Sequence, residues 1–289
     1  MEAYGGYTSS EERDDIEDIL NFVVEKKSLG IITFPTNGVL TGRIVQVVKN
    51  LQKKLRGTKL IITCSIDDTR ELHDKERGVS GTYDKCIETF IKLRGLDIAK
   101  VYLGVTVSRD NCLNISSLFS SLHEKISDLS FSELHFNIVN YSFFYNNANI
   151  APLDSAREPL DYDSYILLNK CYKEKSGKRI KCFLEDRYFK LLEFYLKTRK
   201  APIKCSALHG SCFIDPYGDV YPCINYENKI GNLELTGYHF VNFWKRDLNK
   251  KEAIRESIDK KMCPGCWTPC EAYPSILSNL LTRGQNRYG

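Results

Sequence analysis

The sequence lacks several features that would assign it to common functional classes. Among its 289 residues, no apolar run approaches the roughly 20 that a membrane-spanning helix needs. The 41 basic and 37 acidic residues leave a net charge of +4, which is spread along the chain and does not indicate a nucleic-acid partner. There is no P-loop, no GxGxxG dinucleotide motif and no HExxH zinc motif. We therefore expect a protein that neither crosses a membrane nor binds nucleic acid.

The start of the sequence also lacks a secretory signal, because Met1 is followed by glycines and an acidic stretch instead of an apolar segment. This predicts a cytoplasmic location, where structural disulfides are rare. The 11 cysteines must then be explained by packing, metal binding or redox chemistry.

Six of these cysteines form two short clusters near the end of the chain. The first cluster lies in CSALHGSCFIDPYGDVYPC and the second in CPGCWTPC, and together they comprise Cys205, Cys212, Cys223, Cys263, Cys266 and Cys270. Closely spaced thiolates on tight turns can converge on one point, as a metal ion or an iron–sulfur cluster requires. Spacing alone does not distinguish iron–sulfur from zinc, and reduced structural thiols are a further alternative. Cys64 and Cys86 lie on an apolar strand and an apolar helix face, which favours packing.

Helical and strand periodicities alternate through the first half of the chain. The predicted helices cover residues 16–24, 44–55, 83–91 and 115–126, and the predicted strands cover 30–34, 60–66, 101–107 and 135–141. Near-continuous apolar strands that alternate with helices predict a mainly parallel sheet covered by helices, which is an α/β fold. Ligands of such folds bind at the C-terminal ends of the strands, where this sequence has polar segments.

Two carboxylates, Asp67 and Asp68, stand at one predicted strand end. They could serve acid–base catalysis, but such pairs more often cap the next helix or bind polar groups of a ligand. His73, Asp74 and Arg77 follow, and a loop hydrogen-bond network explains them better than a nucleophilic pair does.

The alternation ends near residue 150. Two helical stretches are predicted at 162–173 and 185–198, and a turn at Asp215–Gly218 between strand-like segments predicts a hairpin. We therefore expect three parts: an α/β domain in 1–150, a helical connection in 151–200, and a small Cys-rich α+β domain that binds metal in 201–289.

Several short motifs occur in the order in which one enzyme family has them. Cys205 is followed after twelve residues by Gly218 and after four more by Cys223, and Ile230–Asn232 and the CPGC turn come next. The first half contains Gly5–Gly6, Thr36–Gly38 after a strand, Ser65–Asp67 at a strand end, and His73–Asp74 with Arg77–Gly78. In these motifs the chain resembles radical S-adenosylmethionine (SAM) enzymes that carry a C-terminal SPASM or twitch auxiliary iron–sulfur domain.

The resemblance implies a fold and two cofactors. The fold is a partial (β/α) barrel that binds SAM at its strand ends, with Gly5, Gly6, Asn37, Ser65 and Asp67 as candidate contacts. The second cofactor is a [4Fe–4S] cluster on the C-terminal cysteines, which the resemblance favours over zinc.

The expected cluster ligands are Cys205, Cys212, Cys223 and one of the three closing cysteines. The remaining two cysteines would then be spare thiols or would bind a cluster with an open position.

Two features depart from the family pattern. The CxxxCxxC motif that holds the catalytic cluster would lie before Gly5, and no segment of the chain supplies it; Tyr7 stands where the family usually has Glu. The readable sheet also lacks its first strand, which would leave an unpaired edge. We therefore expect the chain to be a fragment or a late start of a longer protein.

The resemblance predicts that the intact protein forms a 5′-deoxyadenosyl radical, which abstracts hydrogen from a peptide or small-molecule substrate. The auxiliary cluster would accept an electron or anchor the substrate, and an electron-donor protein is a further candidate partner. Two alternatives stay open: a non-catalytic iron–sulfur module and a zinc-binding structural protein.

Overall fold

The structure is a computed structural model that describes residues 15–26, 30–55, 57–145, 165–166, 168–169 and 182–285. These residues form two compact units. The first unit holds the described residues within 1–139 and 156–177, and the second holds those within 140–155 and 178–289. The three-part division at residues 150 and 200 stays a prediction.

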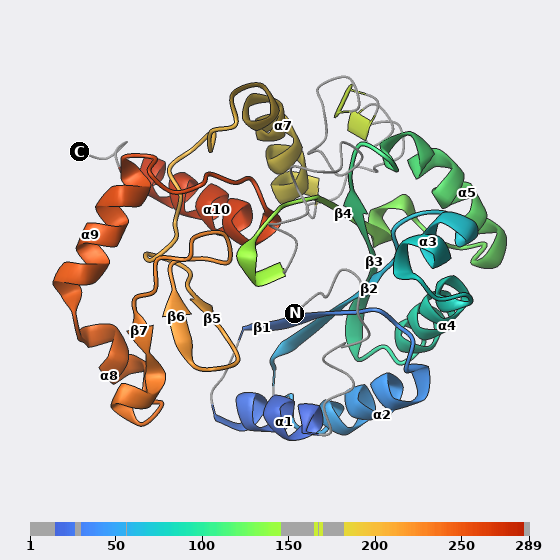
Figure 1. The fold of residues 1–289 in the computed structure, drawn as a ribbon. Helices are drawn as coiled ribbons and strands as arrows, with labels where there is room; N and C mark the ends of the chain where they lie inside the picture. The colour runs from blue at the N-terminus through green and yellow to red at the C-terminus, as the bar shows by residue number, and fades with distance from the viewer. Residues whose placement is uncertain are drawn as a thin grey trace. The chain divides into compact units, whose positions relative to one another are not determined.

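The first unit contains a four-stranded parallel sheet in the order β1-β2-β3-β4 (Figure 1). Its strands are β1 (Ile31–Thr36), β2 (Lys59–Ser65), β3 (Ala99–Val107) and β4 (Leu134–Ile138). In the register of the central strands, Ile62 lies opposite Phe34 on β1 and Val101 on β3. Ile62 and Cys64 of β2 are completely buried, as expected for a parallel strand that is covered on both faces. The predicted α/β fold with a parallel sheet is confirmed.

One helix precedes the sheet and the others connect its strands. They are α1 (Ile16–Lys26), α2 (Thr41–Gln52), α3 (Arg70–Arg77), α4 (Thr82–Arg94) and α5 (Ile115–Lys125), with short 3₁₀ turns η2 (Cys112–Asn114) and η3 (Phe131–Glu133). Four of the five α-helices lie where the apolar periodicity predicts them. The exception is α3, whose sequence RELHDKER buries only His73 and so carries no apolar stripe. The loop predicted around His73 is therefore wrong, and the segment is a helix that ends at Gly78 in the left-handed conformation, with φ +70°.

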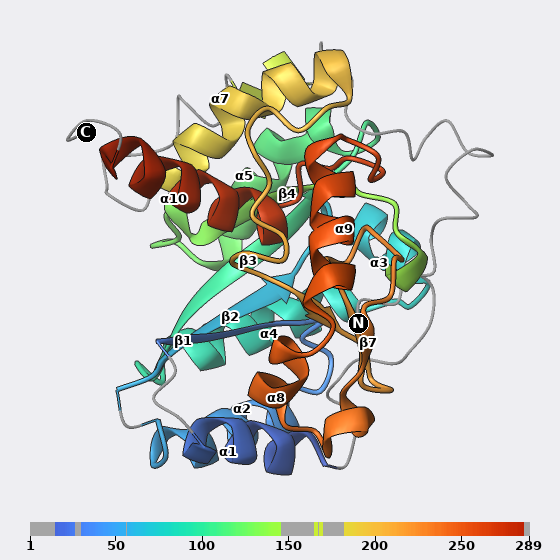
Figure 2. The ribbon, with the colours of Figure 1, turned by 90° about the vertical axis from the view of Figure 1, so that its left-hand side faces the viewer.

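The second unit contains a small antiparallel sheet and several helices (Figure 1 and Figure 2). Its strands are β5 (Phe213–Ile214), β6 (Asp219–Tyr221) and β7 (Gly231–Asn232); its helices are η4 (Phe143–Tyr145), α7 (Cys182–Thr198), η6 (Leu233–Thr236), α8 (Phe240–Lys245), α9 (Leu248–Asp259) and α10 (Pro269–Gln285). The predicted hairpin is confirmed. Asp215 Oδ1 accepts hydrogen bonds from the backbone of Tyr217 and Asp219, and Gly218 adopts φ +82°.

The helical prediction at 185–198 corresponds to α7, whereas most of the 162–173 prediction lies outside the described residues. Within the described part of the chain, no helix is both long and apolar enough to span a bilayer.

Candidate metal centre

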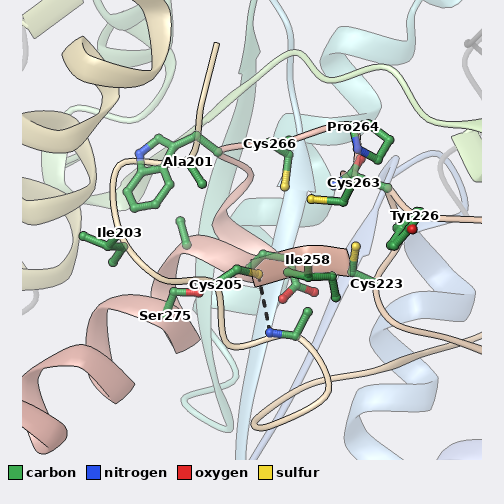
Figure 3. A pocket seen from close by; sticks show the side chains of 16 residues that line it. Ala201, Ile203, Cys205, Cys223, Tyr226, Ile258, Cys263, Pro264, Cys266 and Ser275 are labelled. Atoms are coloured by element: carbon green, nitrogen blue, oxygen red, sulfur yellow. Dashed lines mark hydrogen bonds between the residues drawn. The ribbon is translucent and has the colours of Figure 1, made fainter. Parts of the chain in front are cut away.

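Four thiols line one cavity in the second unit (Figure 3). Two come from the segments on either side of the β5–β6 hairpin, and two come from the turn between α9 and α10; they are Cys205, Cys223, Cys263 and Cys266. Figure 3 shows their sulfur atoms turned toward a common space. The fold therefore brings together two cysteine segments that lie about forty residues apart in the sequence.

The hydrophobic core of the second unit supports these thiols. Cys223 belongs to this core, and Cys205 and Cys263 pack against it. The core combines residues of the hairpin with residues of α8 and α9, among them Val220, Phe243 and Ile258.

Three of the four sulfur atoms face a backbone N–H group two residues farther along the chain. Ala207 donates to Cys205 Sγ over 3.4 Å, and the backbone of Asn225 and Thr268 donates to the sulfurs of Cys223 and Cys266. An N–H directed at sulfur stabilises the thiolate, which is the form that binds metal. The arrangement therefore fits thiolate ligands of an iron–sulfur cluster, whose properties depend on hydrogen bonds to sulfur.

Burial has the opposite effect on the thiols, because it disfavours the charged form. It raises the pKa of Cys205, Cys212 and Cys223, and it raises the pKa of Cys266 to about 12. These thiols are therefore protonated at neutral pH in the absence of a bound group, so metal binding must release protons.

Two buried charged side chains lie near the thiols. Glu271 lines the cavity, its Oε2 accepts a hydrogen bond from Ser211 Oγ over 2.8 Å, and burial raises its pKa to about 7. Arg255 on α9 donates to the carbonyl of Ala207 over 2.6 Å and pairs with Asp259. Sequence reasoning missed both residues; the only signal for Glu271 is its position directly after Cys270.

An aromatic pair holds the closing cysteine turn against α7. The rings of Tyr188 and Trp267 stack with centroids 5.8 Å apart. Each residue also donates to the other: Tyr188 Oη to the carbonyl of Trp267, and Trp267 Nε1 to the carbonyl of Tyr188, both over 3.0 Å. Because Trp267 directly follows Cys266, these contacts restrain the backbone next to that thiol.

Cys212 and Cys270 are not among the residues that line the cavity. Cys212 packs against the core near Glu271, and Cys270 is exposed at the start of α10. Their predicted roles as ligands stay predictions. Among the residues that the structure describes, no three His, Cys, Asp or Glu side chains have the geometry of a single-ion site.

The candidate SAM contacts belong to the first unit. Gly5 and Gly6 lie outside the described residues. Asn37 follows β1, and its Oδ1 accepts a hydrogen bond from the backbone of Val39 over 3.0 Å. Ser65 ends β2 and is buried, and its carbonyl accepts a hydrogen bond from Cys86 Sγ over 3.2 Å. Because β1 and β2 are parallel neighbours, Asn37 and Ser65 lie at the same edge of the sheet.

Asp67 is the centre of a hydrogen-bond network at this edge. Its carboxylate accepts a hydrogen bond from Arg77 Nε over 2.7 Å, and its carbonyl accepts one from Asn111 Nδ2 over 2.9 Å. Its backbone N–H donates to His73 Nδ1 over 3.1 Å. The neighbouring Asp68 accepts hydrogen bonds from Thr69 and Asn114, so both carboxylates are bound by protein groups.

His73 is buried within this network and stays neutral. Burial lowers its pKa to about 4 and outweighs the opposing effect of Asp67. Since Nδ1 accepts the Asp67 N–H, the neutral ring carries its proton on Nε2.

Comparisons with known proteins extend this picture. Residues 205–271 match the SPASM family, which is described as an iron–sulfur cluster-binding domain. The chain is 22% identical to the AdoMet-dependent heme synthase of Nitratidesulfovibrio vulgaris, over 96% of this chain and 73% of the relative. It is 24% identical to the antilisterial bacteriocin subtilosin biosynthesis protein AlbA of Bacillus subtilis, over 78% of this chain and 45% of the relative.

A solved structure of histidine-tagged anSMEcpe with bound AdoMet aligns over 76% of this chain and 55% of that chain, with a TM-score of 0.48 and 17% identity. The chain thus spans less than two thirds of AlbA and of this structure.

Proposed function

Because the chain belongs with the radical SAM proteins that carry a C-terminal SPASM domain, we propose that its second unit binds one [4Fe–4S] cluster. The proposed ligands are the four thiols that line the cavity: Cys205, Cys223, Cys263 and Cys266. A [4Fe–4S] cluster and SAM are the cofactors of this group. When bound, the cluster supplies iron that exchanges one electron at a potential set by its surroundings.

The observation that carries this proposal is the convergence of two distant cysteine segments on one cavity. The N–H groups directed at three of the sulfurs support it, because they favour the thiolate form that a bound cluster requires. The apolar side chains in the cavity wall, such as Ile203, Ile258 and Trp267, would limit the access of water to the cluster.

We place SAM at the C-terminal edge of the parallel sheet in the first unit. The candidates there are Asn37, Ser65 and Asp67, together with Gly5 and Gly6. Their position after parallel strands supports this, since ligands of such sheets bind at that edge. The carboxylate of Asp67 is already bound by Arg77, so Arg77 would hold Asp67 in one orientation toward a ligand.

The whole protein, we propose, abstracts hydrogen from a peptide or a small molecule. The name of AlbA, a bacteriocin biosynthesis protein, supports a peptide, and that of the heme synthase supports a small molecule. The roles of this chain would be to bind the auxiliary cluster and to hold SAM and substrate at the sheet edge.

The test is anaerobic reconstitution with iron and sulfide, followed by metal and sulfide analysis of single variants. Replacing a cavity thiol by serine, as in Cys223→Ser or Cys266→Ser, should abolish most of the bound iron. Cys212→Ser and Cys270→Ser are matched controls that should keep it. If Cys212→Ser loses iron while Cys266→Ser retains it, the proposed ligand set is wrong. Zinc without iron or sulfide in the wild-type chain would favour a structural zinc site instead.

A further inference from the structure

Asn225 has a buried side-chain nitrogen, Nδ2, with no hydrogen-bond partner among the described residues. This residue lines the thiol cavity and lies two positions after Cys223. A buried donor without a partner is destabilising, so this amide is a candidate donor to a group that binds in the cavity.

The orientation of this amide is fixed by a second asparagine. Asn140 Nδ2 donates to Asn225 Oδ1, which identifies the oxygen end of the Asn225 amide and leaves Nδ2 as the free end. Asn140 Nδ2 also donates to the carbonyl of Tyr141 over 3.3 Å, so a second hydrogen bond holds the Asn140 side chain that orients Asn225. The amide of Asn225 is therefore held in one direction before any ligand binds.

The acceptors available at the cavity are few. Most of the wall is apolar or consists of thiols, and the carboxylate of Glu271 is bound by Ser211. The backbone N–H of Asn225 already donates to the sulfur of Cys223. The sulfurs of a bound cluster are hydrogen-bond acceptors, so the side chain of Asn225 could supply a second donor beside the first.

We infer that Asn225 donates an Nδ2–H hydrogen bond to a sulfur atom of the auxiliary cluster, and that Asn140 positions its amide for this contact. The inference rests on the proposed cluster. A hydrogen bond to sulfur stabilises the more negative, reduced cluster more than the oxidised one, so Asn225 raises the reduction potential. The residue thereby sets how readily the cluster accepts an electron.

The experiment compares Asn225→Leu, Asn140→Leu and wild type after reconstitution, with Asn242→Leu as a matched control at an exposed position on α8. Iron and sulfide are counted first, and the midpoint potential is then measured by redox titration followed by electron paramagnetic resonance. At a fixed potential, Asn225→Leu should lower the ratio of reduced to oxidised cluster about tenfold. For a one-electron couple this corresponds to a midpoint potential that is about 59 mV lower. Asn140→Leu should shift it in the same direction by less, and Asn242→Leu should leave it unchanged.

A labelling measurement keeps the inference testable if Asn225→Leu folds poorly. Wild-type protein containing asparagine labelled with ¹⁵N only at the side-chain amide should show a ¹⁵N coupling to the reduced cluster in pulsed electron paramagnetic resonance. A loaded wild-type cluster without that coupling, or an Asn225→Leu cluster with the wild-type potential, overturns the inference and leaves the proposed cluster intact. A wild-type chain that takes up no iron and sulfide overturns both.

Discussion

At the residue scale, burial decides the protonation of the groups that matter most in both units. The cavity thiols are protonated because burial outweighs the N–H groups that face them. His73 is neutral because burial outweighs the nearby carboxylates of Asp67 and Asp74. In each case the charged or hydrogen-bonding partners are close in the sequence, and the burial that outweighs them depends on packing that only the structure shows.

His73 should make the first unit sensitive to mild acid. Its pKa is about 4 in the folded chain against an ordinary 6.5, so below pH 6.5 the unfolded chain binds a proton that the folded chain does not. Stability is therefore retained above pH 6.5 and lost progressively as the pH falls toward 4. Between pH 7 and pH 5 the free energy of unfolding should fall by roughly 2 kcal/mol, because each pH unit below 6.5 lowers it by about 1.4 kcal/mol.

Hydrogen exchange of the amides in β2 measures this effect locally. The free energy of the opening that exposes these amides to solvent should fall between pH 7 and pH 5 in the wild type. In His73→Gln this free energy should fall by less. Equal changes in the two proteins would contradict the assignment of a neutral buried His73.

The sequence predicts candidate residues better than it predicts their contacts. Cysteine spacing selected all six C-terminal candidates, and the role of Cys212 as a ligand stays a prediction. The structure puts the Cys212 thiol against the core and two thiols of the closing turn in the cavity. That choice depends on the hairpin, on Trp267 and on the core, which sequence spacing does not encode.

At the element scale, the turn between β1 and α2 is held by close backbone contact. Gly38 has φ +75°, and a Cβ at this position would lie 2.7 Å from the Cα of Cys86 on α4. The carbonyl of Gly38 also accepts a hydrogen bond from Thr89 Oγ1 over 2.6 Å. Only glycine permits this approach, which places Asn37 at the sheet edge.

Gly38→Ala should destabilise the first unit by roughly 1–3 kcal/mol, because it adds both backbone strain and a clash with backbone atoms. Gly42→Ala is the matched control: it lies in α2 with nothing within 4 Å of an added Cβ, and it should stabilise by about 0.5–1 kcal/mol. Thermal unfolding followed by circular dichroism distinguishes the two. A Gly38→Ala protein as stable as the wild type would contradict the close approach.

The contacts between Tyr188 on α7 and Trp267 in the closing cysteine turn lead to a prediction about stability and iron retention. Tyr188→Phe removes the hydrogen bond to the Trp267 carbonyl and leaves a buried acceptor, so it should cost about 1–3 kcal/mol. Because Trp267 adjoins Cys266, the variant should also release iron to a chelator faster than the wild type. Tyr217→Phe, at a position 81% exposed, should change neither property.

Element prediction succeeded where apolar periodicity was strong and failed where it was weak. All four strands and four helices of the first unit followed the pattern. Helix α3 was missed because only His73 is buried on it, and α10 was obscured because it contains Cys270 and Pro274. The short strand β7 has two residues, which is too few for any periodicity to indicate.

At the scale of the whole molecule, the chain combines a parallel α/β unit with a Cys-rich unit, as the sequence predicted. The family match of residues 205–271 coincides with the unit that contains the thiol cavity. The cysteines of a CxxxCxxC motif are absent from the sequence. In the proposed function the two units have different roles: the sheet edge of the first would bind SAM, and the thiol cavity of the second would bind the cluster.

The chain by itself should not cleave SAM reductively. Purified chain with iron, sulfide, dithionite and SAM should yield no 5′-deoxyadenosine above a control without protein, because the thiolates that would hold a catalytic cluster are missing. Chromatography of the reaction mixture measures the product. A clear yield would mean that other cysteines of this chain serve that cluster.

The central claim is that the second unit holds a cluster of iron and inorganic sulfide. Its most direct test is a Mössbauer spectrum of the ⁵⁷Fe-reconstituted chain, recorded together with an acid-labile sulfide assay. We expect the signal of a [4Fe–4S] cluster with iron and sulfide in equal amounts. Mononuclear iron without sulfide, or a chain that retains only zinc, would contradict the account.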